Sequence, residues 1–254
     1  EDIKLEYQLE SQFMISSSYM ELGEHKKAQK LIEKMPRSSI WTGYARHNYI
    51  IEMMLGNNSG RSLNLLIEDS TFYLPDTKEG RDLRDRINLV SAIHYLELGK
   101  NRSANKYLKQ ISLAGPYTPA ALLQYGWVNA EQGDYEAALQ PWRELQTRFN
   151  RFDPDVMESM LGVPQLFELM GAYSQAIKSF ESIEKRLLAM KDFIGITRQN
   201  LSSGQWLDEW VAVQPDSGWG WQSELDSTAP FGDSSGLLQN LLAEDLIVSG
   251  IREY

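Results

Sequence analysis

Apolar residues recur at intervals of three and four along most of the chain. The clearest examples flank two glycines and cover residues 119–132, 134–149, 154–170 and 172–188. These intervals match the turn of an α-helix, so each segment is expected to bury one stripe of its surface. The pattern predicts an all-α chain whose helices are separated by glycines.

Five glycines divide the helical segments at nearly regular intervals. They are Gly23, Gly56, Gly99, Gly133 and Gly171, which are separated by 33, 43, 34 and 38 residues. A period in the thirties is typical of stacked helical pairs. Glycine adopts the left-handed conformation that ends a helix at little steric cost, so we expect each of the five to close a first helix.

Small and large apolar residues follow these glycines at fixed offsets. Alanine lies five residues after four of the glycines, at Ala28, Ala104, Ala138 and Ala176. A large apolar residue lies nine residues after the same four, at Ile32, Leu108, Trp142 and Phe180. The alanine methyl allows two antiparallel helices to approach closely, and the larger side chain is expected to wedge between successive pairs.

Capping residues mark several helix starts. Thr118-Pro119 and Asp153-Pro154 each place a capping residue before a proline at the first helical position, and Asp134 can accept a hydrogen bond from a free amide of the following helix. Asp153 and Asp155 look like a carboxylate pair but are better explained as such a start.

Two prolines, Pro141 and Pro164, lie inside helical segments. An interior proline costs ~3 kcal/mol unless the helix adjusts, which predicts a local bend at each.

The offsets resemble the tetratricopeptide repeat family, whose pattern is Trp, Leu-Gly, Tyr, Gly, Tyr, Ala, Phe, Ala and Pro. The unit 119–152 matches at Gly126, Gly133, Tyr135, Ala138 and Trp142, and the unit 157–190 at Phe167, Gly171, Tyr173, Ala176 and Phe180. The first repeat unit of the chain keeps Tyr19, Gly23, Ala28, Ile32 and Pro36. The unit around Gly99 lacks the aromatic residue after the glycine. The unit around Gly56 is assigned from its helical periodicity alone. The resemblance, which covers roughly residues 5–190, implies an α-solenoid of about five antiparallel helix pairs.

The predicted domains are a repeat domain over 1–200 and an acidic, Trp-rich capping segment over 201–254, packed on the solenoid.

The resemblance also implies that the first helices of the pairs line a concave groove. The predicted partner-binding residues are Phe13, Met20, Ile50, Met53, Leu89, Ile93, Leu96, Leu123, Trp127, Leu161 and Gln165. Because this set is mostly apolar, and large apolar surfaces are normally covered, we expect an occupant. One candidate is a helix of another protein, and the other is the C-terminal end of this chain. The Lys, Asn and Arg set with which some family members bind a terminal carboxylate is absent.

The C-terminal segment is rich in tryptophan. It contains Trp206, Trp210, Trp219 and Trp221, then a Ser-, Asp- and Gly-rich stretch over 222–236, and then an amphipathic stretch with Leu237, Leu238, Leu241, Leu242, Leu246 and Ile247. Tryptophans that anchor a capping segment explain this composition. A glycan-binding or glycan-active site built from Trp219, Trp221, Glu224 and Asp226 is the alternative.

Composition removes several kinds of chemistry. The chain has no cysteine, which excludes disulfides and thiolate catalysis, and its three histidines are scattered. No phosphate-binding loop or nucleophile turn occurs, so we assign no catalytic residue, no cofactor and no metal site. No apolar run is long enough to span a membrane.

The net charge of −10 is concentrated near the end of the chain. Residues 205–254 carry nine acids and one base, which gives −8. An acidic chain without a basic stripe argues against nucleic acid and anionic lipid as partners. The acidic end is either a solvated face or a contact for a basic partner segment.

Together these features predict a non-catalytic scaffold or adaptor that binds other proteins. Absence of cysteine and a first residue other than Met favour the bacterial cell envelope, on the periplasmic side, with the cytoplasm as the alternative. We expect the chain to continue beyond residue 254, where a coiled coil could form a homo-oligomer. Partner, pathway and organism cannot be derived from these residues.

Overall fold

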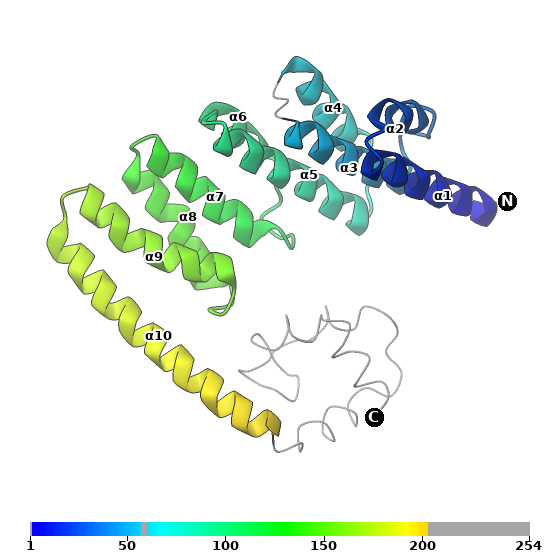
Figure 1. Ribbon diagram of the computed structural model, residues 1–254. Helices are drawn as coiled ribbons and strands as arrows, with labels where there is room; N and C mark the ends of the chain where they lie inside the picture. The colour runs from blue at the N-terminus through cyan, green and yellow to red at the C-terminus, as the bar shows by residue number, and fades with distance from the viewer. Residues whose placement is uncertain (1, 57–59, 203–254) are drawn as a thin grey trace. The chain divides into compact units, whose positions relative to one another are not determined.

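The computed structural model describes residues 2–56 and 60–202, and this part of the chain contains ten helices and no strand (Figure 1). The helices are α1 (Asp2–Glu21), α2 (His25–Ile32), α3 (Ile40–Leu55), α4 (Arg61–Phe72), α5 (Lys78–Glu97), α6 (Asn101–Leu108), α7 (Thr118–Glu131), α8 (Tyr135–Arg148), α9 (Pro154–Leu169) and α10 (Tyr173–Ser202). The all-α prediction is confirmed. Within the two described ranges, none of the helices combines the length and the hydropathy needed to cross a membrane.

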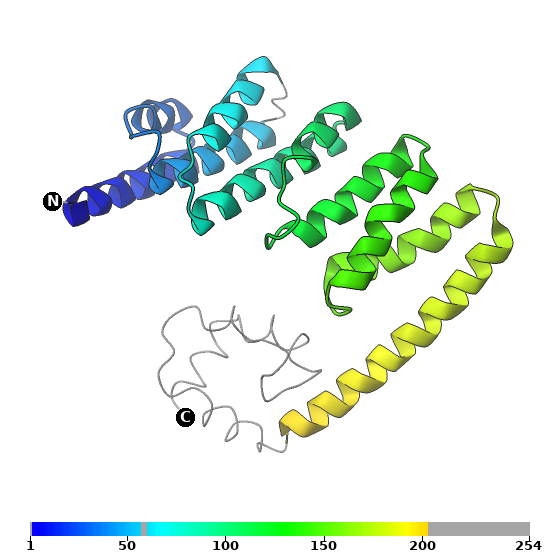
Figure 2. The same ribbon diagram turned by 180° about the vertical axis from the view of Figure 1, so that it is seen from behind.

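The helices form pairs within two compact units, Glu1–Leu145 and Gln146–Tyr254. In the first unit α1 packs on α2, α3 on α4 and α5 on α6, and α7 bonds to α8 through Trp142. The first helices of successive pairs also contact one another, α1 with α3, α3 with α5 and α5 with α7, as both views show (Figures 1 and 2). In the second unit α9 packs on α10. The predicted fold, a TPR-like α-solenoid of five helix pairs, is confirmed.

The predicted domain boundary after residue 200 lies beside the end of the described residues, so the two predicted domains stay a prediction. The C-terminal capping segment falls outside the described residues, so its packing stays a prediction.

Four of the five aligned glycines adopt the same turn. Gly23, Gly99, Gly133 and Gly171 have φ between +66° and +79°. In each turn the glycine N–H donates to the carbonyl three residues earlier, and the next N–H donates to the carbonyl five residues earlier. This pair of hydrogen bonds satisfies carbonyls that the end of a helix leaves free, and it reverses the chain within a few residues.

The prediction for Gly56 is wrong. Its φ of −76° and ψ of 12° place it in a conformation open to any residue. The longer connection between α3 and α4 removes the need for a left-handed turn at this position.

The capping predictions hold at two of three positions. Asp153 accepts a hydrogen bond from the N–H of Asp155 at 2.8 Å, and Asp134 accepts one from the N–H of Ala137 at 3.1 Å. Thr118 does not cap α7. Its hydroxyl donates to the carbonyl oxygens of Ser112 and Gly115, so it ties the preceding loop to the helix.

Trp142 holds α7 and α8 together. The indole is fully buried, and its N–H donates to the carbonyl oxygen of Leu123 at 3.0 Å. Gly126 lies directly against the ring, because a Cβ on this glycine would come within 2.0 Å of Trp142 Nε1. The wedge positions Ile32 and Leu108 are also buried, whereas Phe180 is 42% exposed.

Pro141 is accommodated inside α8 by a side chain of α7. Proline has no N–H, so the carbonyl of Ala137, four residues earlier, receives no helical hydrogen bond from it. The side-chain amide of Asn129 donates to this carbonyl at 3.5 Å, which offsets part of the loss. The helix therefore continues through the proline.

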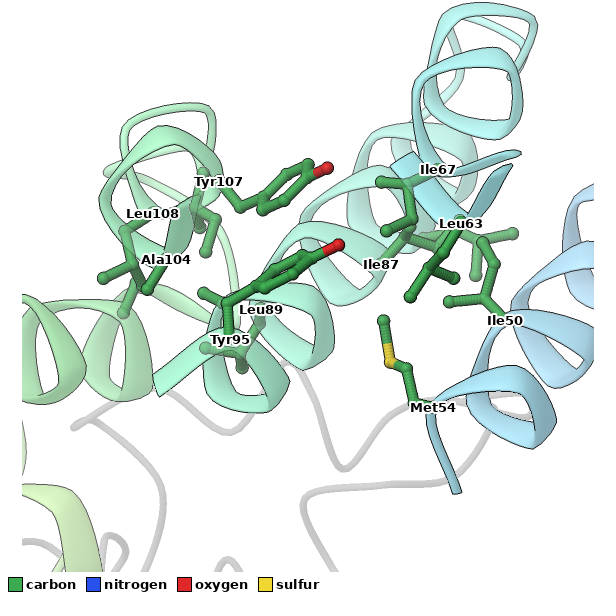
Figure 3. Close-up of a cluster of buried hydrophobic side chains, with 14 of the residues drawn as sticks. Ile50, Met54, Leu63, Ile67, Ile87, Leu89, Tyr95, Ala104, Tyr107 and Leu108 are labelled. Carbon is green, nitrogen blue, oxygen red and sulfur yellow. The ribbon is translucent and has the colours of Figure 1, made fainter. Parts of the chain in front are cut away.

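The core of the first unit combines aliphatic packing with one polar cluster (Figure 3). Ile50 of α3, Ile67 of α4 and Ile87 of α5 are fully buried against one another. Beside them the rings of Tyr95 and Tyr107 stack with centroids 5.7 Å apart, and both hydroxyls donate to Oδ1 of Asn64. This cluster links α4, α5 and α6, and therefore two successive pairs.

Replacing Gly126 with alanine should strongly destabilise the first unit. The added methyl overlaps a fully buried indole, and overpacking costs about 1–3 kcal/mol or more. Gly195→Ala is the matched control, because nothing lies within 4 Å of its Cβ position in α10. There the higher helix propensity of alanine should be neutral or stabilising, by up to ~1 kcal/mol. Urea unfolding of both variants measures the difference, and equal effects would contradict the close α7–α8 packing.

Asp155 should make the second unit less stable as pH rises. Burial, together with the charges of Asp153 and Glu158, raises the pKa of Asp155 to about 6. The unfolded-state pKa is about 3.9, so the folded state binds the proton more tightly and stability falls between pH ~4 and ~6. Asp155→Asn should raise the melting temperature at pH 7.5 and flatten this pH dependence. The exposed Asp192→Asn is the control and should leave both unchanged.

Candidate functional site

Four of the predicted partner-binding residues are buried in the first unit. Met20 is 6% exposed, Ile50 0%, Leu89 8% and Leu123 1%. Each first helix packs against its own partner helix and against neighbouring first helices, which leaves a narrower exposed stripe than the sequence projection assumed. These four positions stabilise the fold, and a partner cannot reach them in this conformation.

Five others keep part of their surface exposed in the same unit. Met53, Ile93 and Leu96 lie at the margin of the main core cluster. Phe13 lies 5.8 Å from the ring of Trp41, and Trp127 packs edge-on against Trp142 at 4.9 Å. They remain candidates for partner contact. Leu161 and Gln165 are exposed on α9 of the second unit.

A pocket that the sequence did not indicate lies among α3, α5 and the loop before α7. Its volume is about 350 Å³, and its lining residues are Tyr44, Lys78, Glu79, Asp82, Leu83, Arg86 and Tyr117. Glu79, Asp82 and Arg86 are three and four residues apart, so they share one face of α5. Two tyrosine rings and four charged groups therefore surround one hollow.

One hydrogen bond organises this α3–α5 pocket. The hydroxyl of Tyr44 donates to Oε1 of Glu79 at 2.7 Å. Burial, followed by the bond and charge of Glu79, raises the pKa of Tyr44 to about 12. The phenol therefore stays protonated near neutral pH and holds the carboxylate in place between the two helices.

Charges of both signs reach the pocket. Arg86 is exposed, and its positive charge acts on Tyr44 and on His47. Burial lowers the pKa of His47, which keeps this imidazole neutral. The pocket can therefore accept a polar or charged side chain, while Met53, Ile93 and Leu96 offer apolar contacts farther along α3 and α5.

The sequence contained only part of the signal for this pocket. The stretch of α5 from Lys78 to Arg86 reads as an ordinary charged helix face. The tyrosines come from positions 44 and 117, and only the fold brings them to the same hollow.

Other proposed chemistry is not located. Trp219, Trp221, Glu224 and Asp226 fall outside the described residues. Within the described ranges, no three side chains of the His, Cys, Asp and Glu types gather closely enough to hold a metal ion.

Comparison with known proteins agrees with the repeat architecture. Residues 120–149 match the family model described as tetratricopeptide repeat. No curated protein matches the chain. The crystal structure of a point variant of a Podosopora anserina putative kinesin light chain with nearly identical TPR-like repeats is 13% identical, with a TM-score of 0.45 over 74% of this chain and 98% of that one. A second structure of that protein is 13% identical, with a TM-score of 0.43 over 71% and 95% of the two chains.

Both TM-scores are low, so the fold assignment rests on the helix pairs and on the family match. Tetratricopeptide repeats are in general protein-interaction scaffolds and are typically non-catalytic. Residues 120–149 match a tetratricopeptide repeat, and with the pairs around them they give the TPR-like solenoid that the sequence resemblance predicted.

Proposed function

We propose that this protein is a non-catalytic adaptor that binds a partner protein on the exposed face of α3, α5 and α7. The observation that carries the proposal is the α3–α5 pocket, which lies on first helices of successive pairs and is lined by Tyr44, Arg86 and Tyr117. Tyrosine and arginine are enriched at the residues that contribute most binding energy in protein interfaces.

The pocket suits one anchoring side chain of a partner segment. Its volume of about 350 Å³ is at the lower end of the range for small-molecule sites. Opposite charges around the hollow favour an occupant with a polar or charged end. Ile93 follows Arg86 by two helical turns on the same side of α5, which favours an amphipathic helix whose apolar side lies along this helix.

We further propose that the adaptor works in a bacterial cell-envelope assembly, on the periplasmic side. The support is compositional, since the chain has no cysteine that could mispair in an oxidising compartment. Its net charge of −10 favours partners with basic segments over nucleic acid.

Arg86→Glu should weaken partner binding by roughly tenfold or more without unfolding the protein. The change reverses an exposed charge beside the pocket, and electrostatic complementarity is a major source of interface specificity. The control is Arg102→Glu, the same change at an exposed site on the second helix α6. Affinity capture from the native host with the wild type and both variants, followed by titration of the captured partner, measures the effect.

If the Arg86 and Arg102 variants bind the captured partner with equal affinity, the pocket is not part of the binding site. Circular dichroism melts of both variants should match the wild type, which separates loss of binding from loss of fold.

A fusion of the complete protein to a reporter should locate to the periplasm. Fractionation by osmotic shock should release the fusion with periplasmic markers, and recovery only with cytoplasmic markers would overturn the proposed compartment.

A further inference from the structure

The second unit has an open apolar groove between α9 and α10. The groove has a volume of about 360 Å³, and its walls include Leu161 of α9 with Phe180, Leu187 and Leu188 of α10. These four side chains are 39% to 54% exposed. Ile183 also lines the groove and is only 7% exposed, and Ala176 and Met190 of the same helix are buried.

Comparison with the other helix pairs shows that the groove face of α9 and α10 exposes positions that are mostly buried elsewhere. Phe180 follows its glycine by nine residues, and the equivalent side chains Ile32, Leu108 and Trp142 are at most 5% exposed. Leu161 precedes its glycine by ten residues, and the equivalent side chains Arg46, Leu89 and Leu123 are at most 8% exposed, whereas Phe13 is partly exposed.

In the first unit a following helix covers this face of a pair. The pair α5–α6 is contacted on both of its helices by α7. The face of α9–α10 that exposes Leu161 and Phe180 therefore has the form that receives the first helix of another pair.

We propose that residues 237–249 of this same chain occupy the α9/α10 groove as that next helix. Leu237 and Leu241 are four residues apart, as are Leu238, Leu242 and Leu246. Two adjacent ladders of this spacing give one broad apolar helix face. Gly250 follows directly, as a glycine follows the first helix of the other pairs.

The connecting chain is long enough for this docking. Residues 203–236 number 34, from 236 − 203 + 1, and an extended chain of that length spans roughly 100 Å. The whole of α10 is only about 45 Å long at 1.5 Å per residue. Tethering also gives the segment a local concentration on the order of millimolar, an advantage over a second copy or a separate partner.

Charge favours the same occupant. The groove lining contains one base, Lys191, and one acid, Glu184, which lies two helical turns earlier on α10. The helix as a whole carries five basic and three acidic residues. None of the ion pairs found in the described part of the chain involves Lys191. Residues 237–249 contain Glu244 and Asp245 and no base, so their acidic edge can face Lys191.

Hydrogen–deuterium exchange of the full 254-residue chain tests the proposal. Amides of 237–249 should be protected in the wild type, and Leu161→Glu or Leu187→Glu should speed their exchange at least roughly tenfold. Ala189→Glu is the matched control, an exposed α10 position roughly 200° around the helix from Leu187. It should leave the protection unchanged. Retained protection of α9 and α10 amides in all three variants shows that the pair still folds.

Because the chain has no cysteine, cross-linking provides a second readout without background. The double variant Lys191→Cys/Glu244→Cys, treated with a bismaleimide, should give a cross-linked monomer. Ala189→Cys/Glu244→Cys should give much less. Cross-linked dimers instead would assign the groove to a second copy. Unprotected amides over 237–249, or protection insensitive to both groove variants, would also overturn the proposal. None of these measurements depends on the partner or on Arg86.

Discussion

The contact between Trp142 and Gly126 is the constraint on which the α7–α8 pair depends. A tryptophan can be fully buried between two helices only if the opposite helix has no side chain there and an acceptor receives the indole N–H. Gly126 meets the first condition, and the carbonyl of Leu123 meets the second. The α1–α2 and α5–α6 pairs use the smaller wedge residues Ile32 and Leu108, which need less room on the opposite helix. The four left-handed glycine turns then set the antiparallel direction of four of the five pairs, whatever fills their centres.

Repetition made most of the fold predictable from the sequence. The offsets from each glycine to its alanine and wedge residue are local, so they survive even at low similarity. The exception is informative. Gly56 fits the period but has a negative φ, and its connection from α3 to α4 is longer than the three-residue connections at the other four glycines. A period therefore indicates where a helix ends, while the length of the connection decides how it ends.

The binding face was harder to predict because exposure depends on how many neighbours a helix has. Projection of a single inward stripe included Ile50 and Leu123, which contacts from two sides bury. It also missed Tyr44 and Glu79, which are separated by 35 positions yet share a 2.7 Å hydrogen bond. What remains accessible on α5 is polar near its start and apolar toward its end. The proposed binding face thus combines two kinds of contact along one helix, which would make it more selective than a uniformly apolar groove.

In a fold of stacked helix pairs, each pair buries one of its apolar faces only when another helix packs against it. The last pair of the stack therefore exposes an apolar face, which a closed domain does not. Phe180 and Leu161 are exposed although most of their equivalents are buried, so apolar surface that packing covers in the first unit stays in contact with water at the last described pair. An apolar face of this kind is hard to use as a selective interface, because any amphipathic helix would gain by covering it. A tethered helix of the same chain would outcompete such ligands and leave the polar pocket beside Tyr44 as the selective site. The two proposals then assign different roles to the two units: residues of the second unit complete the fold, and residues of the first bind the partner.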